Sequence, residues 1–271
     1  MSLSSILALV DAAHGAATLK VAGLAGEVLA APVDALVIKR DARDAIPMVG
    51  EGLSGDLVQQ IMDSAEADAN AAAAAAKAVF DNWPASANAS LTEMTGRITD
   101  VLGAMGRVHA LTVLPCGPVR DGVTEAIDTA LFRTGRPALV APLHEVETIG
   151  KRIAIFWNDS AEAAKAVWGA MPFLRQAEQV TVFAVDEDFD ASGALDRLTS
   201  GLGRADIKAD SAVIEPDGSG ASAQLIQAAS DMNADLVVMG AFTHSRLREL
   251  VLGGVTQSML EGLARPTLLA H

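Results

Sequence analysis

The chain has 271 residues, 51% of them hydrophobic and 20% charged, which supplies the core of one large domain or two ordinary ones and excludes a disordered chain. The formal net charge of −14 at pH 7 argues against a nucleic-acid partner, because phosphate backbones require clustered Lys and Arg. No apolar run approaches the roughly 20 residues that cross a bilayer, and the N-terminus lacks a secretory signal pattern, so we expect no membrane partner.

The first half alternates short apolar runs with helical patterns, which is typical of β-α-β units. Six consecutive alanines at 71–76 favour a helix with a tightly packed face. The predicted strands are 5–11, 34–41, 90–96, 110–115 and 137–142, and the predicted helices are 15–29, 56–80, 98–105 and 123–133.

The second half has the same plan with clearer boundaries. The predicted strands are 152–157, 179–186, 211–216, 235–240 and 266–271. Helical spacing lies between them, as in Ala163, Val167, Met171 and Leu174. Strands that alternate with helices in this way predict an α/β fold, with a mainly parallel sheet covered on both faces.

A matched ending in the two halves indicates a tandem duplication. GRPALVAP at 135–142 and ARPTLLAH at 264–271 are both short apolar strands led by Arg-Pro. HEVETIGKR, at 144–152, reads as the linker between them. We therefore expect an N-terminal domain at 1–146 and a C-terminal domain at 151–271, packed together through their last strands.

A glycine-rich segment near the C-terminus is the best candidate for a ligand site. The strand at 235–240 ends on Gly240, and Gly253 closes the polar segment that follows. Ligands of parallel α/β sheets bind beyond the carboxyl ends of strands, and the start of a helix suits an anion. The N–H donors at this helix start belong to Gly254, Val255 and Thr256.

This segment resembles the universal stress protein family, whose nucleotide-binding members carry G-x2-G-x9-G-(S/T) between the fourth strand and the last helix. Gly240 matches the first glycine and Gly253 the third. RIAIFWNDSAEAAKAV, at 152–167, is similar to the family's first strand, turn and helix. The resemblance implies a tandem member with two flavodoxin-like (adenine nucleotide alpha hydrolase-like) three-layer sandwiches, each with a five-stranded sheet. Its nucleotide would be ATP or another adenine nucleotide, with Mg²⁺ as a possible companion.

Three departures from the family pattern affect that expectation. Thr243 occupies the second glycine position, and Gly254 stands where a Ser or Thr hydroxyl contacts phosphate. The acid that usually ends the first strand is replaced by Asn158, with Asp159 shifted by one place. Thr256 carries a hydroxyl two residues later, but helical geometry points it elsewhere. The loop is therefore a degenerate nucleotide site. Whether it still binds a nucleotide is left open.

The first half is a degenerate copy. Pro115 and Pro118 remove backbone donors where a phosphate would need them. Asp11, at the end of the first strand, is expected to cap the following helix. We interpret this half as a domain that does not bind nucleotide.

No other catalytic or metal-binding pattern is present in the sequence. The five histidines lack metal-site spacing, and the acidic run at 186–190 is typical of a solvated loop. The lone Cys116 excludes an intramolecular disulfide and favours a reducing cytoplasm. Whether the protein is an enzyme is left open, with at most slow, incidental ATP hydrolysis expected.

Two functions remain. The protein is a cytoplasmic stress-response regulator that binds an adenine nucleotide in its C-terminal half, or it is a nucleotide-independent module that recognises an unknown protein partner. The tandem chain would mimic a family dimer, and further homodimerisation is possible.

Overall fold

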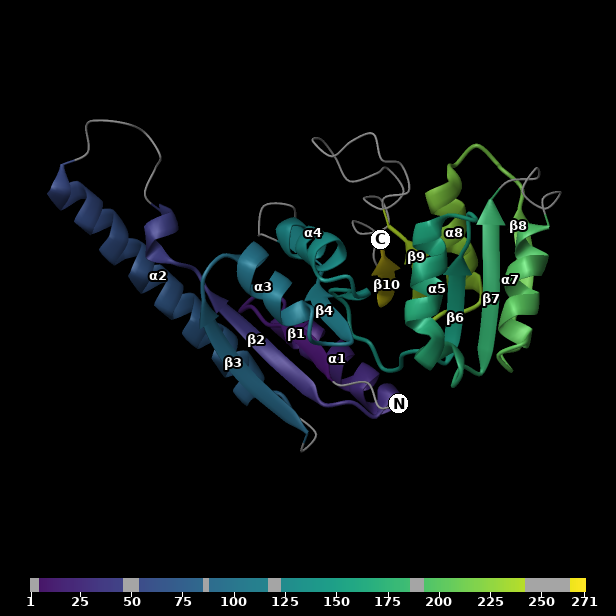
Figure 1. Ribbon diagram of the computed structural model, residues 1–271, viewed down its shortest axis with the longest axis horizontal. Helices are drawn as coiled ribbons and strands as arrows, with labels where there is room; N and C mark the ends of the chain where they lie inside the picture. The colour runs from purple at the N-terminus through teal and green to yellow at the C-terminus, as the bar shows by residue number, and fades with distance from the viewer. Residues whose placement is uncertain (1–4, 46–53, 85–87, 117–122, 186–192, 242–263) are drawn as a thin grey trace.

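The computed structural model describes residues 5–45, 54–84, 88–116, 123–185, 193–241 and 264–271. Its strands form one continuous 10-stranded sheet in the order β3-β2-β1-β4-β5-β10-β9-β6-β7-β8 (Figure 1). The first half of the chain contributes β1–β5 and the second half contributes β6–β10. Each half is a five-stranded α/β unit of the predicted class, and the two units share one sheet.

The first half confirms the predicted elements, with ends that differ by one or two residues at most. Its strands are β1 (Ile6–Leu9), β2 (Val33–Lys39), β3 (Ala89–Thr95), β4 (Leu111–Pro115) and β5 (Ala138–Ala141). Its helices are α1 (Gly15–Leu29), α2 (Gly55–Asp81), α3 (Ile98–Gly106) and α4 (Val123–Arg133), with a 3-10 turn, η1 (Ala42–Ala45), before α2.

The second half confirms its predicted strands to the same accuracy. These are β6 (Arg152–Phe156), β7 (Gln179–Val185), β8 (Asp210–Ile214), β9 (Leu236–Gly240) and β10 (Thr267–Ala270). The helices between them are α5 (Ala161–Leu174), α7 (Ala194–Gly203) and α8 (Ala221–Asp231). The helix expected to begin at Val255 lies outside the described residues.

The two halves meet through their last strands, as expected. β10 pairs with β5 in antiparallel register, with Leu268 opposite Leu139, whereas the other strand pairs of the sheet are parallel. The carboxyl ends of β1–β5 therefore lie at the opposite edge of the sheet from those of β6–β10. In Figure 1, the yellow strand β10 lies between the first half, which runs from purple to teal, and the mainly green second half.

Helices cover both faces of this sheet and create two hydrophobic layers. Successive strand residues alternate between them, so that Ile6 packs in one layer and Leu7 in the other. The first layer contains side chains from α1, α2, α5 and α7, and the second contains side chains from α3, α4 and α8. Both layers include residues from both halves, so the core is continuous across the seam.

The alanine run lies in α2 and packs as predicted on one side. Ala73 and Ala76 are buried, whereas the remaining alanines of 71–76 are exposed. Ser54 caps the helix, since its side chain accepts a hydrogen bond from the N–H of Leu57. Only three residues of this long helix are buried, all in its second half, so its first half lies largely in solvent.

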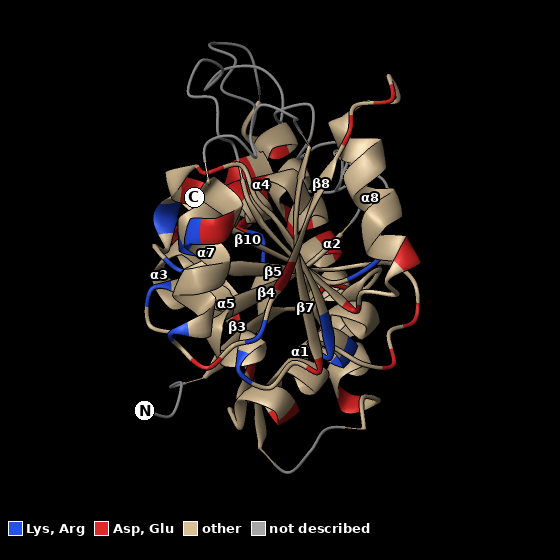
Figure 2. Ribbon diagram, turned by 90° about the vertical axis from the view of Figure 1, so that its right-hand side faces the viewer, with Lys and Arg blue, Asp and Glu red and all other residues tan. Residues whose placement is uncertain are grey.

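Charged side chains are distributed over several helices and loops. In Figure 2, Asp and Glu residues are dispersed over the visible face, with Lys and Arg between them. Among the helices that the structure describes, none is long and apolar enough to cross a membrane.

Candidate functional site

The C-terminal half contains a topological switch point between β6 and β9. From β6 the chain continues to β7 and β8 on one side, and then returns to place β9 on the other side of β6. Ligands of open α/β sheets bind in the crevice beyond the carboxyl ends of such strands. Asn158 and Asp159 follow β6, and Gly240 ends β9, where Phe156 pairs with Met239. The structure therefore brings these three predicted site residues to one edge of the sheet.

The other predicted site residues lie outside the described part of the chain. These are Thr243, Gly253, Gly254, Val255 and Thr256. The acidic run at 186–190 also lies outside it.

Asn158 shapes the turn that leads from β6 into α5. Its Oδ1 accepts hydrogen bonds from the hydroxyl of Ser160 at 2.7 Å and from the N–H of Ser160 at 3.3 Å. Ser160 in turn caps α5, because its Oγ accepts the N–H of Ala163 at 3.1 Å. This cap was not predicted, although a serine directly before a helix is a typical signal for one. The Asn158 carbonyl oxygen is therefore already engaged within the protein.

Asp159 adopts a left-handed backbone with a φ of 55°. Asp and Asn tolerate this conformation better than most residues, although glycine adopts it with the least strain. The carboxylate of Asp159 lies 3.1 Å from Nη2 of Arg197 on α7, in an ion pair whose side chains are 46% and 61% exposed. This pair neutralises the acid nearest to the switch point.

Gly240 has a structural reason to be glycine. A Cβ at this position would lie 2.5 Å from the backbone nitrogen of Ala163 and 2.8 Å from the carbonyl carbon of Glu162. The carboxyl end of β9 therefore touches the first turn of α5 directly. This contact accounts for Gly240 without any ligand.

Trp157, at the carboxyl end of β6, was not predicted as a site residue. Its indole nitrogen is buried and has no hydrogen-bond partner within the structure described. A buried donor without a partner costs about 1–3 kcal/mol, so its presence beside the switch point needs an explanation. A bound acceptor is one explanation.

The sequence of the C-terminal half matches a family model. The universal stress protein family matches residues 151–271. The C-terminal half of the chain is therefore similar to the universal stress protein family.

The likeness extends over the whole chain at the level of fold. A universal stress protein from Archaeoglobus fulgidus DSM 4304 is 13% identical, with a TM-score of 0.66, over 100% of this chain and 99% of that one. A functionally unknown protein from Pseudomonas aeruginosa PAO1 is 14% identical, with a TM-score of 0.56, over 99% of this chain and 92% of that one. None of the curated proteins matches the sequence. These two likenesses extend over both halves, so the whole chain shares its fold with these two proteins.

The first half has an equivalent switch point between β1 and β4. The prediction that Asp11 caps α1 is wrong, because the cap position is His14 and has no side-chain hydrogen bond to the helix. Asp11 instead accepts the N–H of His14, and its second oxygen lies 3.3 Å from the imidazole Nδ1. Cys116, directly after β4, is buried. The contacts between Asp11 and His14 organise the turn before α1.

Within the described residues, no group of three or more His, Cys, Asp or Glu side chains is placed to hold a metal ion. Asp217 follows β8, at the same edge of the sheet as Asn158, and its pKa is lowered. Hydrogen bonds from the hydroxyl and the N–H of Ser219 lower the pKa of this exposed carboxyl, which shapes a turn.

Proposed function

We propose that this protein is a cytoplasmic stress-response regulator whose universal stress protein domain binds ATP or another adenine nucleotide. The observation that supports the proposal best is the topological switch point between β6 and β9, where Asn158 and Gly240 lie at the carboxyl ends of the two strands. The unpaired indole N–H of Trp157 adds a donor at the same strand end.

The residues at this edge suit the neutral parts of a nucleotide. The Asn158 amide and the Trp157 indole would hydrogen-bond a base or ribose. The backbone N–H groups of Gly253, Gly254 and Val255, which follow the family spacing in sequence, would receive the phosphates. Because Asp159 is paired with Arg197, any Mg²⁺ would arrive bound to the phosphates and not to a protein carboxylate. The carboxylates at this edge are engaged within the protein, Asp159 by Arg197 and Asp217 by Ser219, so we propose a binding role with at most slow, incidental hydrolysis of ATP.

The second candidate function is a nucleotide-independent module that binds a protein partner. It is favoured by the contacts that already engage Asn158 with Ser160, Asp159 with Arg197, and Gly240 with α5. A site whose polar groups are satisfied within the protein has less to offer a ligand. Sedimentation of the purified chain would show in addition whether it forms the homodimer that we propose as a further possibility.

Thermal unfolding with and without millimolar Mg-ATP separates the two functions. A ligand present at about 100 times its dissociation constant adds about 2.7 kcal/mol, which is a visible shift in the midpoint. We expect a shift with ATP and AMP but not with GTP, and its loss in Gly253→Asp, which places a carboxylate in the predicted phosphate loop. No shift with any nucleotide would leave the protein-binding module as the function.

A further inference from the structure

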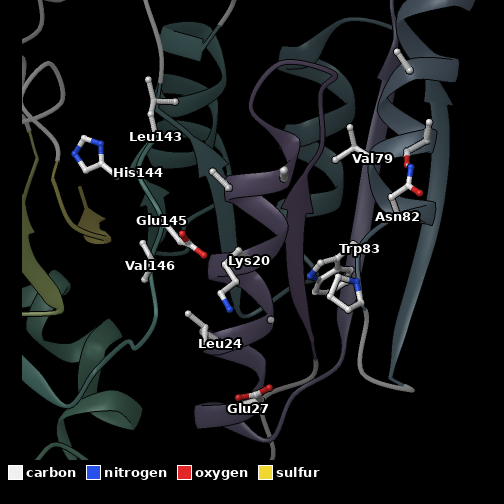
Figure 3. A pocket seen from close by; sticks show the side chains of 16 residues that line it. Lys20, Leu24, Glu27, Val79, Asn82, Trp83, Leu143, His144, Glu145 and Val146 are labelled. Atoms are coloured by element: carbon white, nitrogen blue, oxygen red, sulfur yellow. The ribbon is translucent and has the colours of Figure 1, made fainter.

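A groove on the outer side of α1 is a second candidate site in the molecule. It is a cavity of about 720 Å³ between the second half of α2 and the segment 143–146 that follows β5 (Figure 3). This volume is within the range of about 300–1,000 Å³ that small-molecule sites occupy. It lies in the first half of the chain, whereas the proposed nucleotide site lies in the second.

One wall of the groove is aromatic. A Cβ on Gly23 of α1 would lie 2.9 Å from Cζ2 of Trp83, so the indole rests directly on the helix at its glycine. Leu24 and Val79 extend this apolar surface, and small alanines of α1 and α2 complete it. The groove therefore offers a flat ring and a hydrocarbon surface to a ligand with an apolar body.

Besides His144, the ionisable side chains of the groove are one lysine and two glutamates. Lys20 and Glu27 project from α1, and Glu145 lies on the facing segment (Figure 3). None of the three forms an ion pair with a residue that the structure describes. The two carboxylates outnumber the single ammonium, and the whole chain carries a net charge of −14. The electrostatic potential of the groove therefore favours a cation.

We propose that this groove binds an organic cation with an apolar or aromatic body, such as an amine or a quaternary ammonium compound. The two glutamates attract its charge, and the face of Trp83 receives the cation or the ring attached to it. Lys20 opposes the charge of the ligand and limits its affinity. This inference is independent of the proposed nucleotide function, because the two sites share no residue.

Three probes of the same length separate charge from hydrophobicity. Isothermal titration of the full chain with 3-phenylpropylamine, 3-phenyl-1-propanol and 3-phenylpropionate presents the same ring with a positive, neutral or negative end. We expect the amine to bind most tightly, the alcohol more weakly and the carboxylate least. The affinity of the amine should fall as salt is raised. Equal binding of all three probes, or no binding of the amine, would overturn the proposal.

Substitution of the charged residues of the groove tests the preference for a cation, because removal of an acid and removal of the base should change the amine affinity in opposite directions. Glu145→Gln, on the exposed connecting segment, should weaken amine binding by about three- to fivefold, the range of an exposed ion pair. Lys20→Met should strengthen it by a similar factor, because the repulsion is removed. A weaker affinity in Lys20→Met would contradict the assigned charge preference.

A filling variant locates the binding. Ala17→Phe places a ring inside the groove and should abolish amine binding, whereas Ala164→Phe, on the exposed side of α5, should leave it unchanged. Circular dichroism and the unfolding midpoint report whether each variant is folded. Unchanged binding in folded Ala17→Phe would place the amine elsewhere and refute the assignment.

Discussion

The imidazole Nε2 of His109 lies 3.1 Å from Oδ2 of Asp34. The other ring nitrogen, Nδ1, lies 2.7 Å from the carbonyl oxygen of Met105, which can only accept a hydrogen bond. Both ring nitrogens of His109 therefore lie within hydrogen-bonding distance of an oxygen acceptor. His109 is only 5% exposed, and the pair connects the start of β2 to the segment that precedes β4.

This pair should contribute measurably to stability. We expect a double-mutant cycle of Asp34→Ala and His109→Ala to give a coupling free energy of about 1–3 kcal/mol, because Asp34→Ala removes a hydrogen-bond partner from the nearly fully buried imidazole of His109. The exposed pair Lys151–Glu178, at 4.0 Å, is the control and should show coupling below about 0.5 kcal/mol. Urea denaturation measures both. Equal coupling in the two pairs would disprove the special role of His109.

The same pair predicts a pH dependence. Partial burial raises the pKa of Asp34, but hydrogen bonds from Ser90, His109 and Ser5 outweigh it and hold that pKa below its ordinary value of 3.8. A lowered folded-state pKa stabilises the protein above the unfolded value, and this contribution is lost as the pH falls through the folded pKa. The stability difference between the parent and Asp34→Ala should therefore be constant near neutrality and shrink below pH 3.8. Denaturation at several acidic pH values would reveal it.

Gly240→Ala tests the contact between β9 and α5. The added methyl would lie 2.5 Å from a backbone nitrogen that cannot move independently of its helix, so we expect a loss of about 1–3 kcal/mol. Gly203→Ala is the matched control, because a Cβ there meets nothing within 4 Å. It should be neutral or stabilising by up to about 1 kcal/mol. Similar effects of both substitutions on chemical denaturation would remove the packing explanation for Gly240.

Asp159 provides a test of backbone strain beside the candidate site. At a φ of 55°, Asp159→Gly should be neutral or stabilise the protein by about 1 kcal/mol, despite the loss of the exposed ion pair with Arg197. Asp159→Val should destabilise it by about 1–3 kcal/mol, because a β-branched residue is strained there. Midpoints of thermal unfolding rank the variants. A stable Asp159→Val protein would show that the turn adapts freely.

The periodicity of the sequence was sufficient to predict the elements of the fold. The ends of α1 and α4 agree with the prediction to the residue, because a regular apolar spacing defines each of them. The Arg-Pro endings predicted that the last strands would meet. They could not give the direction of pairing, because an apolar strand such as β10 pairs equally well either way.

The candidate site was less accessible to sequence reasoning. Asn158 and Gly240 could be placed at strand ends from hydrophobic runs alone. The contact of Gly240 with Ala163 could not be predicted, because it depends on how closely a helix approaches a strand far away in the sequence. The ion pair between Asp159 and Arg197 could not be predicted either, because Asp159 lies in the turn before α5 and Arg197 lies in α7. Asp11 was assigned to capping on its residue type, but the chain takes an extra turn before α1 begins.

Leu139 tests whether the two halves unfold together. It lies opposite Leu268 across the seam, and both side chains are fully buried. We expect Leu139→Ala to cost about 2–5 kcal/mol and to shift one cooperative calorimetric transition. Leu143→Ala, whose side chain is 55% exposed, is the control and should change stability by less than about 0.5 kcal/mol. Two separate transitions, of which only one shifts, would show that the halves fold independently.

The antiparallel pairing of β5 with β10 has a consequence for how the molecule behaves on dilution. Two separate chains that joined through such strands would fall apart as their concentration dropped below the dissociation constant. In this chain the two halves are covalently joined by the segment between β5 and β6. Short connections of this kind typically give effective concentrations of the order of millimolar. The joined sheet therefore persists even when a cell contains only a few copies of the protein.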